Sequence, residues 1–197
     1  MNDITIRQKR TRKDLHEALI ELIKIKGYHA ITVKDIVQHA CYNRSTFYKH
    51  FLDKEDQAEQ LLNEMLEGLE LAVGVPYENG QKISTTNLKR PSFNIVSYIY
   101  ECRNFFELLN SEDTLPALHT QLPLAISKIY KEQFYFETID QMPVNMEIFK
   151  RYTAYGFYGI MAHWIETNFE KPEALLIEEI IELTKTHIQA FEYRGKK

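Results

Sequence analysis

Twenty residues from Thr32 to Phe51 constrain the fold of this chain more than any other stretch. They read TVKDIVQHACYNRSTFYKHF, and the first half predicts a short amphipathic helix. Its apolar residues recur at the spacing of one buried helix face, at Val33, Ile36, Val37 and Ala40. Thr32 occupies the N-cap position and Asp35 follows three residues later, which is close to a capping box.

The second half predicts another short helix after a tight turn. Cys41 and Tyr42 form the turn, and Asn43 is a favourable N-cap for the helix that follows. Phe47 and Phe51 lie four residues apart on one face and are expected to be buried. Two short helices joined by a turn, with hydrogen-bonding side chains left exposed on the second, describe a helix-turn-helix.

Around this motif, residues 27–57 resemble the N-terminal signature of the TetR/AcrR family of transcriptional regulators. The resemblance rests on Gly27-Tyr28, Thr32-Val33, Ile36-Val37, Thr46-Phe47-Tyr48, His50-Phe51 and Lys54-Glu55. One position departs from the family, because Cys41 stands where the turn usually has glycine. A non-glycine residue at positive φ is strained by about 1 kcal/mol or more, so either Cys41 tolerates that conformation or the turn differs slightly.

The apolar spacing elsewhere predicts an all-α fold of about nine helices. A three-helix helix-turn-helix head over residues 1–52 is expected to bind DNA. A helical body over residues 53–197 is expected to bind an effector and to dimerise. The first helix of the head ends at Gly27, and a fourth helix starts after Asp53 and joins head to body without a flexible linker.

Within the body, a loop rich in turn residues is predicted over residues 74–92 and no strand pattern is evident. Helical segments are predicted over residues 93–110, 115–138, 143–168 and 172–193. Pro123 lies inside the second of these segments and should kink or split it.

Charge is distributed unevenly along the chain. The formal net charge is −4. Residues 1–54 carry eleven Lys and Arg against six Asp and Glu, a net of +5, and the remainder carries thirteen against twenty-two, a net of −9. A basic head on an acidic body favours phosphate binding by the head. The basic cluster Gln8–Lys13 could lie on the DNA backbone or in a minor groove, or could simply be solvated.

Several patterns argue for a cytoplasmic protein. No apolar run is long enough to span a bilayer, and the N-terminus lacks the apolar region of a secretion signal. Two distant cysteines, Cys41 and Cys102, suggest a reducing compartment without a disulfide framework.

The second short helix carries the candidate DNA contacts. Arg44 is the best base reader, because its guanidinium fork matches guanine O6 and N7. Tyr48, Lys49 and His50 are expected at phosphates, as the family resemblance also implies, and solvation is the alternative for each single residue. The full set of predicted DNA contacts is Thr32, Lys34, Asn43, Arg44, Ser45, Thr46, Tyr48, Lys49, His50 and Lys54.

The resemblance also implies a ligand pocket and a dimer. The last two helices would pair with those of a partner, and the segment Tyr152–Ile165 is apolar nearly all round with small residues interspersed. The aromatic candidates for an apolar or aromatic effector are Tyr98, Phe105, Phe106, Tyr130, Phe134, Tyr152, Tyr155, His163 and Trp164. The alternative is that these side chains only fill core and interface. No spacing suggests a metal site or a cofactor.

The sequence therefore predicts a homodimeric regulator of double-stranded DNA, a ligand-responsive repressor on a palindromic operator. A TetR-like regulator that acts through a protein partner, as an adaptor or coactivator without a small-molecule effector, is the main alternative. An enzyme is disfavoured because the chain offers no nucleophile–base pair, no glycine-rich phosphate loop and no metal-ligand spacing.

Overall fold

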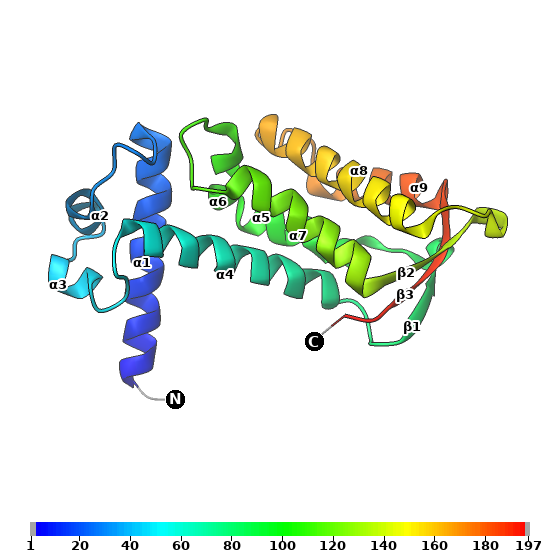
Figure 1. The fold of residues 1–197 in the computed structure, drawn as a ribbon, viewed down its shortest axis with the longest axis horizontal. Coiled ribbons are helices and arrows are strands. Elements are labelled where there is room, and N and C mark those ends of the chain that lie inside the picture. The colour runs from blue at the N-terminus through cyan, green and yellow to red at the C-terminus, as the bar shows by residue number, and fades with distance from the viewer. Residues whose placement is uncertain (1–2, 196–197) are drawn as a thin grey trace. The chain divides into compact units, whose positions relative to one another are not determined.

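The computed structural model describes residues 3–195, with side chains from Ile6 onward. Its helices and strands in chain order are α1 (Asp3–Lys26), α2 (Val33–His39), α3 (Arg44–Phe47), α4 (Lys54–Gly74), β1 (Gln81–Ser84), α5 (Asn94–Glu101), α6 (Arg103–Phe106), α7 (Leu118–Gln133), β2 (Phe134–Thr138), α8 (Met146–Glu166), α9 (Glu173–Lys185) and β3 (Ile188–Tyr193) (Figure 1). Short 3₁₀ turns cover Thr85–Asn87, Arg90–Phe93, Glu107–Asn110 and Ile139–Gln141. The described chain is thus mostly helical, with nine α-helices, as the sequence predicts.

The described chain divides into two compact units. The first takes in the chain up to Met65 together with Asn104–Leu118. The second holds Leu66–Arg103 and the chain from His119 onward. One continuous helix, α4, supplies residues to both units. The first unit is therefore larger than the head expected from the sequence, because part of α4 and a later segment pack with it.

The core of the first unit is formed by the apolar faces that the sequence pattern marks out. Leu15 and Leu19 of α1, Phe47 of α3 and nearby Phe51 are all essentially inaccessible to solvent. The Phe47 and Phe51 ring centroids lie 5.4 Å apart. The Gln57 side-chain amide donates to the Leu15 carbonyl at 2.8 Å and so joins α4 to α1.

The segment Asn104–Leu118 is fixed to the end of α1 by polar contacts within the first unit. The Tyr28 amide donates to the Asp113 carbonyl at 3.1 Å, and the His29 amide donates to the Asp113 carboxylate at 3.2 Å. Lys24 pairs with Glu107. The hydrogen bonds from His29 lower the pKa of the Asp113 carboxyl. Gly27 ends α1 at φ +76°, and the Asp113 carboxylate oxygen lies 2.3 Å from where a Cβ would stand, so this packing requires glycine.

The second unit contains a three-stranded antiparallel sheet that the sequence interpretation missed. The strand order is β1-β3-β2, and the three strands gather at one end of this unit (Figure 1). Phe136 pairs with Phe191 and Phe134 with Tyr193 across β2 and β3. Strands of four to six residues offer too few alternations to be distinguished from a helical stripe. Ile188 and Phe191, for example, also fit a helix at a spacing of three.

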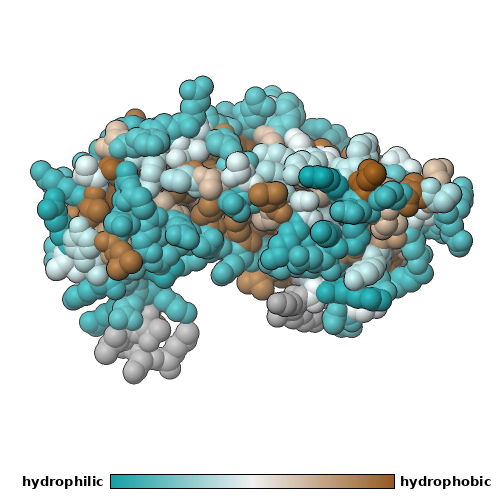
Figure 2. Space-filling view, viewed as in Figure 1, coloured by the Kyte–Doolittle hydropathy of each residue, from teal (hydrophilic) through white to brown (hydrophobic). Residues whose placement is uncertain are grey.

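The structure corrects three further expectations for the body. Residues 74–92 do not form an open loop, because they hold β1 and two 3₁₀ turns. The segments 115–138 and 172–193 are each part helix and part strand. Of the kink or split expected at Pro123, the split does not occur, because α7 runs through this residue as one helix. On the face shown in Figure 2, hydrophobic residues appear as small patches separated by hydrophilic ones.

Candidate nucleic-acid interface

The start of α2 is fixed by the capping box that the sequence predicts. The Thr32 hydroxyl accepts from the Asp35 amide at 3.3 Å, and the Asp35 carboxylate accepts from the Thr32 amide at 2.8 Å. Lys26 lies 2.9 Å from the same carboxylate. Hydrogen bonds from Thr32 and Lys26 hold the pKa of the Asp35 carboxyl well below its usual range. Thr32 and Lys34 are both exposed at this end of α2.

The turn between α2 and α3 keeps the tight geometry even though it lacks glycine. Cys41 adopts φ +58°, the first of the two possibilities left open by the sequence. The Tyr42 amide donates to the Val37 carbonyl at 2.8 Å, and its hydroxyl donates to Asp14 of α1 at 2.7 Å. The turn is therefore held by hydrogen bonds to both α2 and α1.

Asn43 caps α3 and organises the first side chains of that helix. Its Oδ1 accepts from the Thr46 amide at 2.8 Å. The same oxygen also accepts from the hydroxyls of Ser45 at 2.7 Å and Thr46 at 2.9 Å. These hydroxyls keep their lone pairs as acceptors. The capping role explains why Asn43 stands in the predicted set without requiring a direct base contact.

The outward side of α3 and the turn after it present the remaining predicted residues together. Arg44, Ser45, Tyr48 and Lys49 are exposed, whereas Phe47 beneath them is buried. Burial lowers the pKa of His50, and the neighbouring charges of Arg12 and Lys49 act in the same direction. The exposed side chains form a surface rich in hydrogen-bond donors, and the buried ring of Phe47 supports it from beneath.

Lys54 differs from the other predicted DNA contacts. Its ammonium donates to the carbonyls of Tyr28 and Ile31 at 3.1 Å each and lies 4.1 Å from the Tyr28 ring centroid. Only 12% of its side chain is exposed. Its geometry therefore assigns Lys54 to holding the α1–α2 junction.

The second unit contains a small, partly open aromatic cavity of about 60 Å³. Its lining is Val73, Tyr77, Ser92, Phe93, Ile95, Tyr130, Phe134, Phe136, Thr153, Phe157, Thr184, Ile188 and Phe191. No charged side chain is among them. The Tyr77 hydroxyl donates to the Ser92 carbonyl at 2.6 Å, and burial raises the pKa of Tyr130.

Only Tyr130 and Phe134 of the nine predicted ligand contacts line this cavity. Phe105 and Phe106 belong to the first unit and are buried there. Trp164 is buried, with its indole N–H donating to the Lys171 carbonyl at 2.8 Å. The exposed positions are Tyr152, Tyr155 and His163 on α8, and the Tyr98 hydroxyl lies against Gly68. Aromatic content alone could not separate cavity from core, and the missed lining residues come from α4, α5, α8 and α9 as well as from the strands and turns.

Among the described residues, no group of three or more His, Cys, Asp or Glu side chains could hold a metal ion. Within the same residues, no helix is both long enough and apolar enough to cross a membrane.

Two family profiles match the chain. The profile of bacterial regulatory proteins of the tetR family matches residues 15–62, and that of a transcriptional regulator C-terminal region matches residues 86–186. The chain belongs to the TetR family of transcriptional regulators, which are DNA-binding proteins and not enzymes.

Individual relatives agree with this assignment. The chain is 23% identical over 166 residues to YxbF of Bacillus subtilis (strain 168), an uncharacterized HTH-type transcriptional regulator. The match spans 81% of this chain but only 41% of the length of YxbF. A TetR-family structure from Syntrophomonas wolfei superposes with a TM-score of 0.64 at 15% identity, covering 90% of this chain and 94% of its own. The dihydroxyacetone kinase operon activator DhaS gives a TM-score of 0.60 at 18% identity, covering 89% and 94%. At these identities the structural matches show a shared fold.

Proposed function

We propose that the chain is a ligand-responsive repressor that binds a palindromic operator as a homodimer. The observation that carries this proposal is that hydrogen-bond donors are exposed on the outer side of α3, while Phe47 on its inner side is buried against Phe51. The net charge of +5 over residues 1–54 supports an encounter with polyanionic DNA.

In this proposal α3 enters the major groove, which is about 12 Å wide. Arg44 stands at the first turn of α3, is exposed and reads a guanine through two parallel hydrogen bonds. Ser45 and Thr46 offer acceptor lone pairs beside it. Tyr48 and Lys49 bind phosphates, which fix the register but carry no sequence information.

Arg44→Ala is expected to relax preference at one base pair of each half-site by about 1–3 kcal/mol. Lys49→Ala should instead weaken binding to all sequences alike and reduce the magnitude of the salt slope by about 1. Both effects are measured as affinities for single-base variants of a selected site at several salt concentrations.

The two substitutions serve as controls for each other, because each removes one exposed cation from the same short region. Coincident base-preference profiles for Arg44→Ala and the parent would contradict the reading role of Arg44.

The dimer surface in this proposal is formed by α8 and α9. Nothing lies within 4 Å of a Cβ built on Gly156 or Gly159, so both glycines leave room for another helix. A groove of about 740 Å³ runs between these helices, with Leu175 on its α9 side. Tyr152 is 73% exposed and Leu175 51% exposed. Exposed apolar side chains beside open glycines suit the close approach of a second copy's helices.

The effector in this proposal is neutral and apolar or aromatic. An ionic group in the cavity of the second unit would be buried without a charged partner, which is strongly unfavourable. Tyr77 and Thr184 already use their hydroxyl protons on backbone carbonyls. A ligand there gains chiefly from contact with aromatic rings.

The helix α4 provides a covalent route for the response. Val73 near its end lines the cavity, and Lys54 at its start holds the α1–α2 junction. A ligand that shifts the cavity wall would thus favour a different head position. A coupling of about 1–3 kcal/mol would reduce operator affinity 5- to 150-fold.

The cavity volume favours one alternative, regulation through a protein partner. At about 60 Å³ the cavity is far smaller than the roughly 300–1,000 Å³ of typical ligand pockets. The structural neighbour DhaS is an operon activator, so this fold is not restricted to repressors.

These alternatives are separated by releasing the purified protein from selected DNA with a panel of neutral aromatic compounds. Release by a compound that also raises the melting temperature supports the sensor. Absence of release, together with a stoichiometric partner protein that changes DNA affinity, supports the adaptor.

A further inference from the structure

The helix α1 begins well before the packed core of the first unit. Residues 6–10 are all exposed, and the first fully buried side chain is that of Leu15. Residues 7–13 of this helix include five cations and no carboxylate, the cations being Arg7, Lys9, Arg10, Arg12 and Lys13. Residues 6–10 are exposed, so packing in the core does not explain their charge.

One side of α1 holds the helix-turn-helix. Asp14 accepts from the Tyr42 hydroxyl at 2.7 Å, and Glu21 lies 2.5 Å from the His39 ring nitrogen. Asp14 and Glu21 are seven residues apart, which is close to two helical turns, so they lie on the same side of α1.

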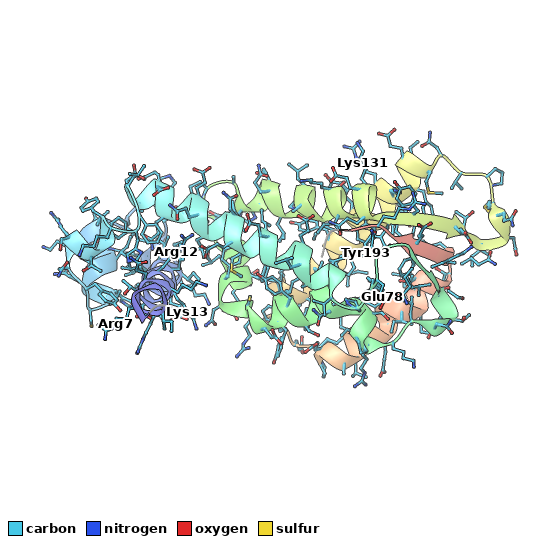
Figure 3. The ribbon with its side chains drawn as sticks, turned by 90° about the horizontal axis from the view of Figure 1, so that it is seen from below. Arg7, Arg12, Lys13, Glu78, Lys131 and Tyr193 are labelled. Carbon is cyan, nitrogen blue, oxygen red and sulfur yellow. The ribbon has the colours of Figure 1, made fainter. Side chains whose placement is uncertain are left out.

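The same spacing continues toward the N-terminus. Arg7 lies seven residues before Asp14, and Arg10 lies four residues before it. Both arginines therefore extend the side of α1 that holds the turn leading into α3. Figure 3, which looks along α1, places Arg7 toward α2 and α3 and Lys13 on the other side.

The remaining arginine of the cluster has an internal role. Arg12 pairs with Glu64 of α4, and its guanidinium carbon lies 5.8 Å from the Phe51 ring centroid. Of these five cations, Arg12 packs within the unit, Lys13 lies 3.5 Å from Glu17 of the same helix, and Lys9 lies on the side opposite to Asp14. Arg7 and Arg10 lie beside the helix-turn-helix.

We propose that the first turns of α1 form a second DNA contact, in which Arg10, with Arg7 one turn away, binds backbone phosphates next to the stretch read by α3. The inference rests on the proposed function and extends the interface beyond the helix-turn-helix itself. Guanidinium groups suit this task because their planar fork donates two parallel hydrogen bonds to a phosphate.

The contact carries no base information, because phosphates are the same in every sequence. It acts through counterion release, so its signature is the dependence of affinity on salt. Each phosphate contact contributes about −0.9 to the slope of log K against log salt on duplex DNA.

The test uses the full-length chain and two duplexes, one selected by the parent protein and one of unrelated sequence. Arg10→Gln should reduce the magnitude of the salt slope by about 0.9 and lower affinity roughly eight-fold at about 0.1 M salt, on both duplexes. The Arg7→Gln/Arg10→Gln double variant should reduce the slope by about 1.8. Lys9→Gln is the control, since Lys9 is an exposed cation five residues before Asp14, which places it on the opposite side of the same helix, and its slope should equal that of the parent.

An Arg10→Gln slope equal to that of the parent would overturn the inference and leave the proposed function standing. Equal reductions from Arg10→Gln and Lys9→Gln would also overturn it, because the effect would then come from net charge and not from a contact. A parent that binds neither duplex would overturn both proposals.

Discussion

Phe47→Ala is expected to destabilise the first unit by about 3–5 kcal/mol and to abolish DNA binding as a consequence. Phe47 is completely buried, and its ring contacts that of Phe51 at 5.4 Å between centroids. Phe47 is the buried residue of this four-residue helix, so removing its ring leaves a cavity beneath the helix. A helix this short has little stability of its own and depends on such packing.

The neighbouring residue provides the matched control. Tyr48 is 57% exposed and points away from the core. Tyr48→Ala should change the free energy of unfolding by less than about 1 kcal/mol while weakening DNA binding. Both variants are thus expected to bind DNA less well, Phe47→Ala because the first unit is destabilised and Tyr48→Ala because a surface contact is lost.

Thermal unfolding followed by circular dichroism, together with DNA titration, separates these outcomes. In a unit of this size each 1 kcal/mol corresponds to roughly 4–8 °C in melting temperature. If the Phe47→Ala variant is as stable as the parent, or if Tyr48→Ala is destabilised as much as expected for Phe47→Ala, the buried role of Phe47 and the exposed role of Tyr48 are wrongly assigned.

The second large effect concerns His16, a buried histidine in the first unit. It is 5% exposed, and neither ring nitrogen has a hydrogen-bond partner. Burial, reinforced by the charge of Arg12, lowers the pKa of His16 from 6.5 to about 4. Glu64 on α4 is the facing carboxylate, at 3.6 Å from Nε2.

The sign of the pH effect follows from proton binding. Between about pH 6.5 and pH 4 the unfolded chain holds a proton on this histidine that the folded chain does not. Stability is therefore retained above this window and falls as the pH falls through it, by roughly 3 kcal/mol at its lower end.

His16→Leu should remove this dependence, because leucine fills the site without a titrating group. Its unfolding free energy should decline less than that of the parent between pH 6.5 and 4, and carboxylates contribute equally to both proteins. At neutral pH the variant should be at least as stable, since two unsatisfied buried nitrogens are gone. Parallel pH profiles for parent and variant would contradict the assignment.

The helix-turn-helix was predictable because its determinants are local. The Thr32–Asp35 capping box, the Asn43 cap and the buried pair Phe47 and Phe51 are each visible within a few residues, and all occur in the structure. The left-handed conformation of Cys41 remained open in the sequence, because the surrounding contacts that stabilise it come from α1 and α2.

The body was less predictable because its determinants lie far apart in the chain. The central strand β3 pairs with β1, more than a hundred residues earlier, and with β2. Helical spacing at Ile188 and Phe191 is equally compatible with a buried strand, so pairing decides the outcome. The same non-local pairing brings Tyr77, Phe136 and Phe191 into the cavity, and none of these was a predicted ligand contact.

The packing of Asn104–Leu118 with the head was also not visible in the sequence. Asp113 occupies the space beside Gly27, at a separation of 86 residues. The glycine itself was recognised only as a helix end. Its second role, leaving room for a carboxylate, depends on a partner that periodicity cannot reveal.

The central claim, a dimer that reads DNA through α3, is tested most directly by selecting duplexes from a random pool with the full-length protein and weighing the complexes. We expect an inverted repeat whose half-site centres lie about one helical turn, 34–36 Å, or a multiple of it apart, with an even number of chains on each duplex. Enrichment of a single unrepeated half-site bound by one chain, or no enrichment above non-specific binding, would contradict the claim.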